Sequence, residues 1–336
     1  YARGSSLVGS EMCIRDSIVT SKRIYGPYKR EASSLCFGTM QFGAGATEAD
    51  SAQMYEDCRA AGINFFDTAY VYTEGQSEKI LGRLIAAERE QIILVTKAGA
   101  VGGSSKKNIR SQLETSLSRL EQDYTDIFFL HRFDDNTPLE ETFEALAQLK
   151  EEGKFFHLGV SNFSAWQVMK AQGLALRHGF PLVELLQPMY NLVKRQAEVE
   201  LLPMALSENL GVISYSPLGG GLLTGKYADK SDPSDGRLSW DKKYAARYGE
   251  DWMHEAAAKL KIIAAEAGLD PLALAVAWVA RHKGITAPII SARNQAQLVP
   301  SLQAAEINMT DQLYQVLCDL TPTPPPATDR LEEQKV

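Results

Sequence analysis

The chain has 336 residues, of which 45% are apolar and 23% are charged, and its formal net charge at pH 7 is −7. That composition is typical of a globular protein, and the length suits one large domain or two ordinary ones. The acidic balance argues against a nucleic-acid partner, which needs clustered Lys and Arg, and no apolar run is long enough to predict a membrane partner.

Residues 1–17 have no sustained hydrophobic period, no signal-peptide pattern and no initiator Met. We interpret them as a non-native leader and exclude them from the fold. The four cysteines, Cys13, Cys36, Cys58 and Cys318, are scattered without a CxxC pair. This spacing predicts reduced thiols and a cytoplasmic location.

Apolar runs bounded by turn residues predict strands that alternate with helical patterns from Leu35 onward. The predicted strands are 35–42, 63–67, 92–97, 127–131, 156–160, 183–187, 211–216 and 287–291. The predicted helices start near residues 47, 74, 105, 138 and 164, then span 196–209, 254–267 and 271–282, start again at 294, and end with 310–320.

The segment 219–251 is longer than an ordinary connection, starts with three consecutive Gly and contains Pro233 and Trp240. Long connections in compact domains are commonly functional, so we expect a lid or a cofactor clamp here. The proline-rich and then charged segment 321–336 predicts a flexible tail.

Repeated strand–helix units with buried apolar strands favour parallel pairing with helical crossovers. We therefore predict an α/β fold, a single-domain (β/α)8 TIM barrel over residues 18–320. The alternative is a doubly wound open sheet, which would bind a dinucleotide on a glycine-rich turn after its first strand. The run Gly38-Thr39-Met40-Gln41-Phe42-Gly43 lacks the GxGxxG pattern, so the barrel is preferred.

Four polar side chains are the candidate catalytic group. Asp67, Lys97 and His131 each end a predicted strand, and Tyr72 follows Asp67 by five residues. In a parallel barrel the carboxyl ends of all strands lie on one face, so these groups can meet there. Taken singly, each has an ordinary structural explanation, as a turn residue, a packed aromatic, a surface charge or a core histidine. Their shared placement is what favours a catalytic site.

The chemistry of the group suits proton delivery. A free phenol has a pKa of about 10, and a nearby ammonium favours its ionised form and lowers that value. We assign Tyr72 as general acid, Lys97 as its modulator, Asp67 as the partner of Lys97, and His131 as the residue that orients a polarised carbonyl. The group has no thiol nucleophile and no metal-ligand spacing, so we predict no metal, and the electrons must come from another source.

Several motifs together resemble those of the aldo-keto reductases over roughly residues 33 to 305. They are FFDTAYVYTEGQSEKILG, VTKAG, FLHRFD, GVSNFS, LLQPMYN, YSPLGGGLLTGKY and PIISARNQAQL. The resemblance implies a barrel that reduces a small-molecule aldehyde or ketone to an alcohol. It also implies NADP(H) as cofactor in preference to NAD(H), and leaves the oligomeric state open.

The resemblance also implies roles for cofactor-binding residues. It places Ser161, Asn162 and Gln187 on the nicotinamide carboxamide and stacks Tyr215 on the ring. Asp67 is also counted among the cofactor-binding residues. The residues along the pyrophosphate are Ser216, Pro217, Leu218, Gly219, Gly221, Leu222 and Lys226, and backbone contacts near the same site are made by Gly38, Thr39 and Met40. The adenosine end is held by Ser291, Arg293, Gln297 and Ser301. Two departures occur, because Ser291 replaces a usual Gly and Pro300-Ser301 replace an acidic residue and Asn.

Three alternatives follow from other features. The run Gly220 to Lys226 fits GxxxxGK of a P-loop, but Tyr227 stands where Ser or Thr would hold Mg²⁺. Some barrels of this family resemble channel accessory subunits that use bound cofactor as a redox sensor, which gives a binding module with little turnover as the alternative function. A hydrolase barrel lacks the paired His or carboxylate ligands that it would need.

Overall fold

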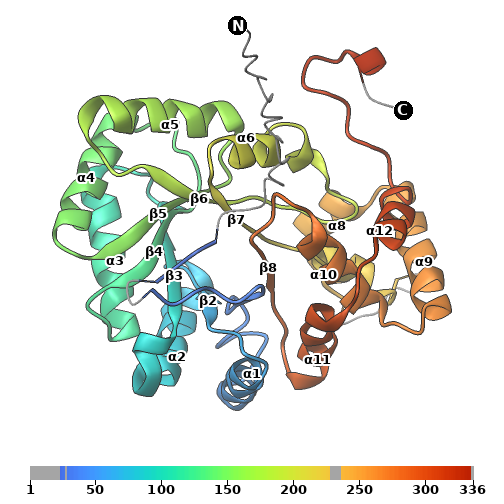
Figure 1. The fold of residues 1–336 in the computed structure, drawn as a ribbon. Helices are drawn as coiled ribbons and strands as arrows, with labels where there is room; N and C mark the ends of the chain where they lie inside the picture. Colours follow the sequence, from blue (N-terminus) through green and yellow to red (C-terminus); the bar gives the residue numbers. More distant parts are fainter. Residues whose placement is uncertain (1–22, 27–28, 228–235, 334–336) are drawn as a thin grey trace, which may run out of the picture.

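The computed structural model describes residues 23–26, 29–227 and 236–333. Eight parallel strands close into a barrel in chain order, and β8 pairs with β1 to complete it. Helices surround the strands on the outside (Figure 1). The predicted (β/α)8 barrel is therefore confirmed, and the doubly wound open sheet is excluded.

The strands are short and lie close to the predicted positions. They are β1 Cys36–Gly38, β2 Phe65–Asp67, β3 Ile93–Ala98, β4 Thr125–Leu130, β5 Phe155–Ser161, β6 Val183–Gln187, β7 Gly211–Ser214 and β8 Ala287–Ile290.

The helices follow the strands in alternation, with extra short helices between β7 and β8. The α-helices are α1 Glu48–Ala60, α2 Gln76–Ile85, α3 Lys106–Leu120, α4 Leu139–Glu151, α5 Ala165–His178, α6 Leu201–Ser207, α7 Arg237–Trp240, α8 Lys242–Tyr248, α9 Asp251–Glu266, α10 Pro271–Arg281, α11 Gln295–Gln303 and α12 Asp311–Cys318. The 3₁₀ helices are η1 Tyr72–Gly75, η2 Ala86–Gln91, η3 Gln196–Glu198, η4 Gly219–Thr224, η5 Ala304–Glu306 and η6 Leu331–Glu333.

Two predicted elements differ from the structure. The strand predicted at 35–42 ends at Gly38, because the chain then turns and the amide of Phe42 donates to the carbonyl of Thr39 at 2.9 Å. The helix predicted at 196–209 is broken into η3 and α6. Pro203 explains the break, since it has no N–H and its ring clashes with the carbonyl four residues earlier in a continuous helix.

The barrel interior is filled by alternate residues of the strands. Phe65, Val95 and Phe129 belong to the inner apolar cluster, whereas Phe66 faces outward and its ring lies 5.0 Å from that of Tyr55 on α1. Because side chains alternate along a strand, the residue two positions beyond each inward one also points into the barrel. Asp67, Lys97 and His131 occupy those positions after Phe65, Val95 and Phe129, so the sequence pattern brings them to one rim.

The amino end of the barrel is closed by Ile24, which packs in the inner cluster. Tyr25 and Glu31 form an antiparallel bridge beside it. The predicted leader, residues 1–17, lies outside the described residues. At the start of the predicted tail, Thr321 accepts a hydrogen bond from Arg195 at 3.2 Å.

The helices within the described part of the chain include no single one that is long and apolar enough to cross a membrane. The helices α9 and α10 reach the length and apolar composition of a membrane span when they are taken together, but they bend by 100° at the break between them.

Candidate active site

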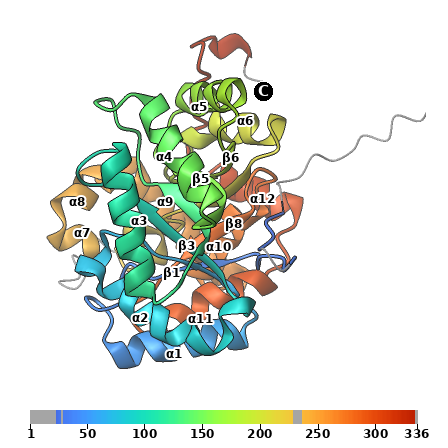
Figure 2. The same cartoon turned by 90° about the vertical axis from the view of Figure 1, so that its left-hand side faces the viewer.

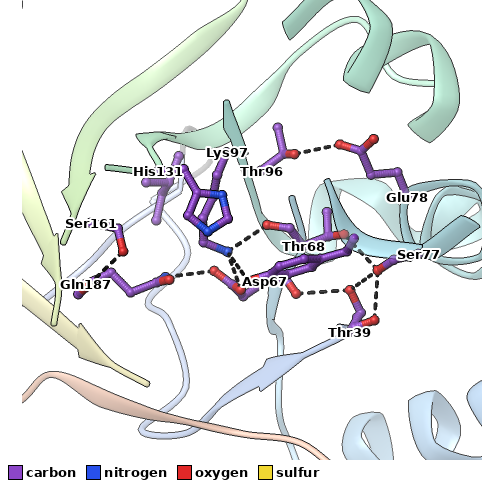
Figure 3. A network of polar contacts seen from close by, with 12 residues as sticks. Thr39, Asp67, Thr68, Ser77, Glu78, Thr96, Lys97, His131, Ser161 and Gln187 are labelled. Carbon is purple, nitrogen blue, oxygen red and sulfur yellow. Dashed lines mark hydrogen bonds and ion pairs between the residues drawn. The ribbon is translucent and has the colours of Figure 1, made fainter. Parts of the chain in front are cut away.

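A fully buried lysine lies at the centre of the rim group. The side chain of Lys97 has no exposed surface, and its Nζ lies 2.5 Å from Asp67 Oδ1. The same ammonium donates to the carbonyl of Thr68 at 2.8 Å and to Tyr72 Oη at 3.4 Å. Figure 3 shows the contacts of Lys97 with Asp67 at the end of β2 and with Thr68 directly after it. The structure thus brings the acid, the amine and the phenol together, although their assigned roles stay predictions.

Both carboxylate oxygens of Asp67 accept a hydrogen bond. Its second oxygen accepts a hydrogen bond from the side-chain amide of Gln187 at 2.8 Å, across the barrel from β6. Only 3% of the Asp67 side chain is exposed. A carboxylate this deeply buried needs such partners in place of water, and its contact with Lys97 favours the ammonium form of that side chain. Burial lowers the pKa of Lys97, but Asp67 and Tyr72 outweigh it, so the net pKa is raised.

The environment of Tyr72 differs from the sequence-based expectation in one respect. Burial raises the pKa of Tyr72, Lys97 opposes that increase, and Asp67 adds to it, so the net pKa lies above the usual value. The expected lowering by Lys97 is present but is outweighed, because the sequence does not reveal how deeply the phenol is buried. The phenol therefore stays protonated at neutral pH, which is the form that a general acid requires.

His131 faces the same space. Its ring packs edge-on against that of Tyr72, with centroids 5.9 Å apart. Burial, followed by the charges of Lys97 and Arg132, lowers the pKa of His131 to about 3. A neutral imidazole results, with one nitrogen that can donate to a carbonyl oxygen. Its Nδ1 is buried and has no hydrogen-bond partner in the protein.

The residues proposed for the nicotinamide form a connected network on the neighbouring strand ends. Ser161 Oγ donates to the carbonyl of Gln187 at 2.9 Å, and the amide of Asn162 donates to the carbonyl of His131 at 2.9 Å. Tyr215 Oη donates to Asn162 Oδ1 at 2.8 Å. Asn162 has a positive φ of 58°, a left-handed backbone conformation that is uncommon outside glycine. These contacts fix the side chains before any ligand arrives.

An elongated cleft of about 720 Å³ joins this rim to α11. Most of the sequence-predicted residues line it, namely Gly38, Met40, Asp67, Tyr72, His131, Ser161, Asn162, Gln187, Tyr215, Ser216, Pro217, Leu218, Gly221, Lys226, Ser291, Arg293 and Gln297. Many of these side chains are polar or charged, and the volume of the cleft is within the range expected of a cofactor site.

Four of the predicted cofactor residues do not line the cleft. Thr39 is buried behind it, where its hydroxyl contacts Ser77 Oγ at 2.7 Å. Gly219 and Leu222 are buried within η4. Ser301 is buried on α11, and its Oγ has no hydrogen-bond partner in the protein. The roles assigned to these four residues stay predictions, and the contact predicted for Thr39 is one of its backbone.

Sequence reasoning missed a group of lining residues from the long connection. The guanidinium groups of Arg237 on α7 and Arg247 on α8 both lie over the Tyr244 ring, at 3.7 Å and 5.0 Å from its centroid. All three line the cleft, and α7 and α8 lie at one end of the barrel (Figure 2). Their spacing gives no apolar period, so tertiary packing alone places them. The role of this segment as a lid or clamp stays a prediction.

The far end of the cleft is basic and lies at a helix amino terminus. Asn294 caps α11 by accepting from the amide of Gln297 at 3.1 Å, while Arg293 and Ser291 line the wall. Ser291 Oγ is buried and has no hydrogen-bond partner in the protein. Free amides and a guanidinium at such an end suit a phosphate group. The donors present therefore fit the phosphorylated end of a nicotinamide dinucleotide.

Metal ligands are not gathered in the described part of the chain, where no group of three or more His, Cys, Asp or Glu side chains could hold an ion. Cys36, Cys58 and Cys318 are buried free thiols, and Cys13 lies outside the described residues. His157, on the opposite rim from the cleft, contacts Glu184 at 2.9 Å and the carbonyl of Tyr25 at 2.9 Å, as a structural residue would.

A closed (β/α)8 barrel with a buried Tyr–Lys–Asp group beside a large polar cleft is the arrangement expected of a cofactor-dependent carbonyl oxidoreductase. The chain belongs to the aldo/keto reductase family, because the model of the Aldo/keto reductase family matches residues 34–319. Members of this family use nicotinamide cofactors and act on small-molecule carbonyl substrates, so the protein is an NAD(P)H-dependent oxidoreductase.

Characterised and uncharacterised relatives are similar over most of their length. A probable voltage-gated potassium channel subunit beta of Arabidopsis thaliana is 35% identical over 292 residues, which cover 82% of this chain and 88% of the relative. An uncharacterized oxidoreductase, YrpG, of Bacillus subtilis is 34% identical over 87% of this chain and 93% of its own. Aflatoxin B1 aldehyde reductase member 2 of Rattus norvegicus is 37% identical over 80% of this chain and 79% of its own.

Proposed function

We propose that the protein uses NADPH to reduce an aldehyde or ketone to an alcohol, with Tyr72 as the general acid. The observation that carries this proposal is the contact of Tyr72 Oη with Lys97 Nζ at 3.4 Å, beside a cleft wide enough for cofactor and substrate. When bound, the nicotinamide cofactor supplies a hydride to the carbonyl carbon. The protein's task is to hold the carbonyl and protonate its oxygen.

Each side chain of the rim group has a distinct part in that task. His131 is neutral and donates a hydrogen bond to the carbonyl oxygen, which polarises the carbonyl. Tyr72 gives its proton to the same oxygen. Lys97 stabilises the phenolate that remains, and Asp67 keeps Lys97 charged and in place. The protons belong to a coupled set, so the observed pH dependence belongs to the group and not to one residue.

The preference for NADPH over NADH rests on the basic end of the cleft. Arg293 and the amide groups at the start of α11 suit a phosphate monoester, and a guanidinium can donate two hydrogen bonds to it. Ser291 offers a hydroxyl at the position where the family usually has Gly. The three buried free thiols are those of a reducing compartment, which supports a cytoplasmic location.

A panel of aldehydes and ketones tests this function, with loss of NADPH absorbance followed over time and the series repeated with NADH. We expect turnover of at least some carbonyls and a lower KM for NADPH than for NADH. Tight NADPH binding without turnover of any carbonyl in a broad panel would contradict the proposal.

A second candidate function is a redox-sensing subunit, supported by the similarity to the Arabidopsis thaliana protein named as a probable channel subunit. In that case the cofactor would be held for long periods and turned over slowly. Co-purification with a membrane partner, together with turnover far below one per second under saturating carbonyl, favours this second function over the first.

A further inference from the structure

A buried ion pair lies behind the candidate active site, outside the cleft. Glu78 on α2 has no exposed side-chain surface, and its Oε2 lies 3.1 Å from Arg119 Nη1 on α3. The other carboxylate oxygen accepts a hydrogen bond from Thr96 Oγ1 at 2.7 Å (Figure 3). A buried carboxylate needs such partners to stay ionised, because it has no water. The proposed mechanism so far gives this pair no part.

Each partner of Glu78 reaches an element that carries a catalytic side chain. Thr96 directly precedes Lys97 in β3. Arg119 Nη1 donates to the carbonyl of Tyr70 at 2.9 Å, and its guanidinium lies over the Tyr70 ring, 4.6 Å from the centroid. Tyr70 comes two residues before Tyr72 in the chain. The ion pair therefore ties the strand of the amine to the loop of the phenol.

The loop that carries Tyr72, residues 68–75, needs such support. Directly after Tyr72, the backbone is left-handed at Thr73, Glu74 and Gly75, with φ of 45°, 53° and 88°. Consecutive residues in this region are strained unless they are glycine, and they persist only where their surroundings hold them. Thr73 Oγ1 donates to the carbonyl of Phe42 at 2.9 Å, which is one such restraint.

Gly75 shows that Arg119 packs directly against this strained segment. A Cβ at position 75 would lie 2.5 Å from Arg119 Cζ, so the guanidinium fits there only because the residue is glycine. The guanidinium thus contacts the 68–75 loop on both sides of Tyr72, at Tyr70 and at Gly75. Its own position is fixed by the buried Glu78.

We propose that Glu78 and Arg119 are positioning residues that hold the 68–75 loop so that Tyr72 Oη stays within reach of Lys97 Nζ. The inference rests on the proposed role of Tyr72 as general acid. The contact is already long for a hydrogen bond, at 3.4 Å, so a small displacement of the loop breaks it. A misplacement of about 1 Å can lower a catalytic rate by about 100-fold.

Arg119→Met tests the proposal, with Arg110→Met as a matched control. Arg110 also lies on α3 and is ion-paired, to Glu152 at 2.6 Å, but it faces away from the loop at the surface. We expect Arg119→Met to lower kcat by about 30- to 100-fold while the Kd for NADPH changes by less than about threefold. Arg110→Met should match the wild type in both quantities. Arg119→Lys, which keeps the charge paired to Glu78, should recover part of kcat.

The pH profile separates positioning from a general structural role. The alkaline limb of kcat reports the coupled group of Tyr72, Lys97 and Asp67. Lys97 opposes the increase in the pKa of Tyr72, so a loop that moves away from Lys97 shifts this limb to higher pH. The double variant Glu78→Gln with Arg119→Gln leaves no buried charge unpaired and carries the same test if Arg119→Met does not fold. If the decrease in kcat is no larger than the decrease in the fraction of folded protein, and the alkaline limb of kcat is not shifted, the proposal is contradicted.

Two further results contradict the positioning role. One is wild-type kcat in a folded Arg119 variant, and the other is a loss of NADPH binding as large as the loss of kcat. If instead the wild-type protein itself reduces no carbonyl, it is the proposed function that fails.

Discussion

Replacing Lys97 with Met removes the charge on which the rim group depends. Lys97 Nζ lies 3.4 Å from Tyr72 Oη and 2.5 Å from Asp67 Oδ1. At 3.4 Å and an effective dielectric constant of about 20, an ammonium attracts a phenolate by about 5 kcal/mol. If the phenol oxygen carries roughly half of a negative charge in the transition state, Lys97 stabilises that state by about 2.5 kcal/mol, and the substitution removes this stabilisation. We therefore expect kcat to fall by about 100-fold, near the lower end of what general acid catalysis contributes.

The same substitution also destabilises the fold, and this effect has to be separated from catalysis. The side chain of Asp67 is only 3% exposed, and without Lys97 its carboxylate keeps Gln187 as its remaining side-chain partner, with no opposite charge beside it. An unpaired buried charge costs about 3–5 kcal/mol. The double variant Lys97→Met with Asp67→Asn removes that charge, so most of the unfolding free energy should return while kcat stays low.

Urea denaturation and single-turnover reduction with NADPH measure the two quantities independently. The expected pattern is low kcat in both variants, with low stability in the single variant alone. Turnover within about threefold of the wild type in the folded double variant would show that the phenol does not need Lys97, and the assigned mechanism would be refuted.

Three further predictions concern the cofactor, pH and packing. Arg293→Ala should weaken NADPH binding by about 10- to 100-fold in a fluorescence titration, because a charged hydrogen bond contributes about 1.5–3 kcal/mol, while NADH binding changes little. Since burial lowers the pKa of His131 to about 3, the unfolded chain takes up a proton below its ordinary pKa of about 6.5 and stability falls between these values. From pH 6 to pH 4, the free energy of unfolding should therefore fall less steeply in His131→Gln than in the wild type, with a difference in slope of up to about 1.4 kcal/mol per pH unit. An identical slope in the two proteins would contradict the lowered pKa of His131. Gly159→Ala places a Cβ 2.4 Å from the Phe129 ring and should destabilise by about 1–3 kcal/mol, whereas Gly173→Ala, with open space around it, should be neutral or stabilising in thermal melts.

The barrel and its rim group are predictable from sequence because both depend on local periodicity. Apolar runs that end in Asp67, Lys97 and His131 mark the carboxyl ends of strands, and strand alternation directs these side chains inward. The closure of the sheet then places them together without further information. This is why a pattern spread over many residues of the chain identified a compact site.

The rest of the candidate site depends on tertiary packing, which leaves no periodic pattern in the sequence. Arg237, Tyr244 and Arg247 come from the connection between β7 and β8. Tyr244 packs closely against Gly220, where a Cβ would lie 2.5 Å from the Tyr244 ring. The net pKa of Tyr72 likewise follows from burial, which a sequence does not show. The side chain of Thr39 is turned away from the cleft by its contact with Ser77, which its sequence position does not reveal, and the backbone contact assigned to Thr39 stays a prediction.

The central claim is that Tyr72 supplies the proton, and Tyr72→Phe tests it most directly. Single-turnover reduction of a carbonyl identified in the substrate panel is followed under saturating NADPH, together with the Kd for NADPH by fluorescence. Because the substitution removes one hydroxyl and leaves the ring, we expect an unchanged Kd and a rate lowered by about 100- to 10,000-fold. A single-turnover rate close to that of the wild type, with NADPH bound normally, would contradict the account.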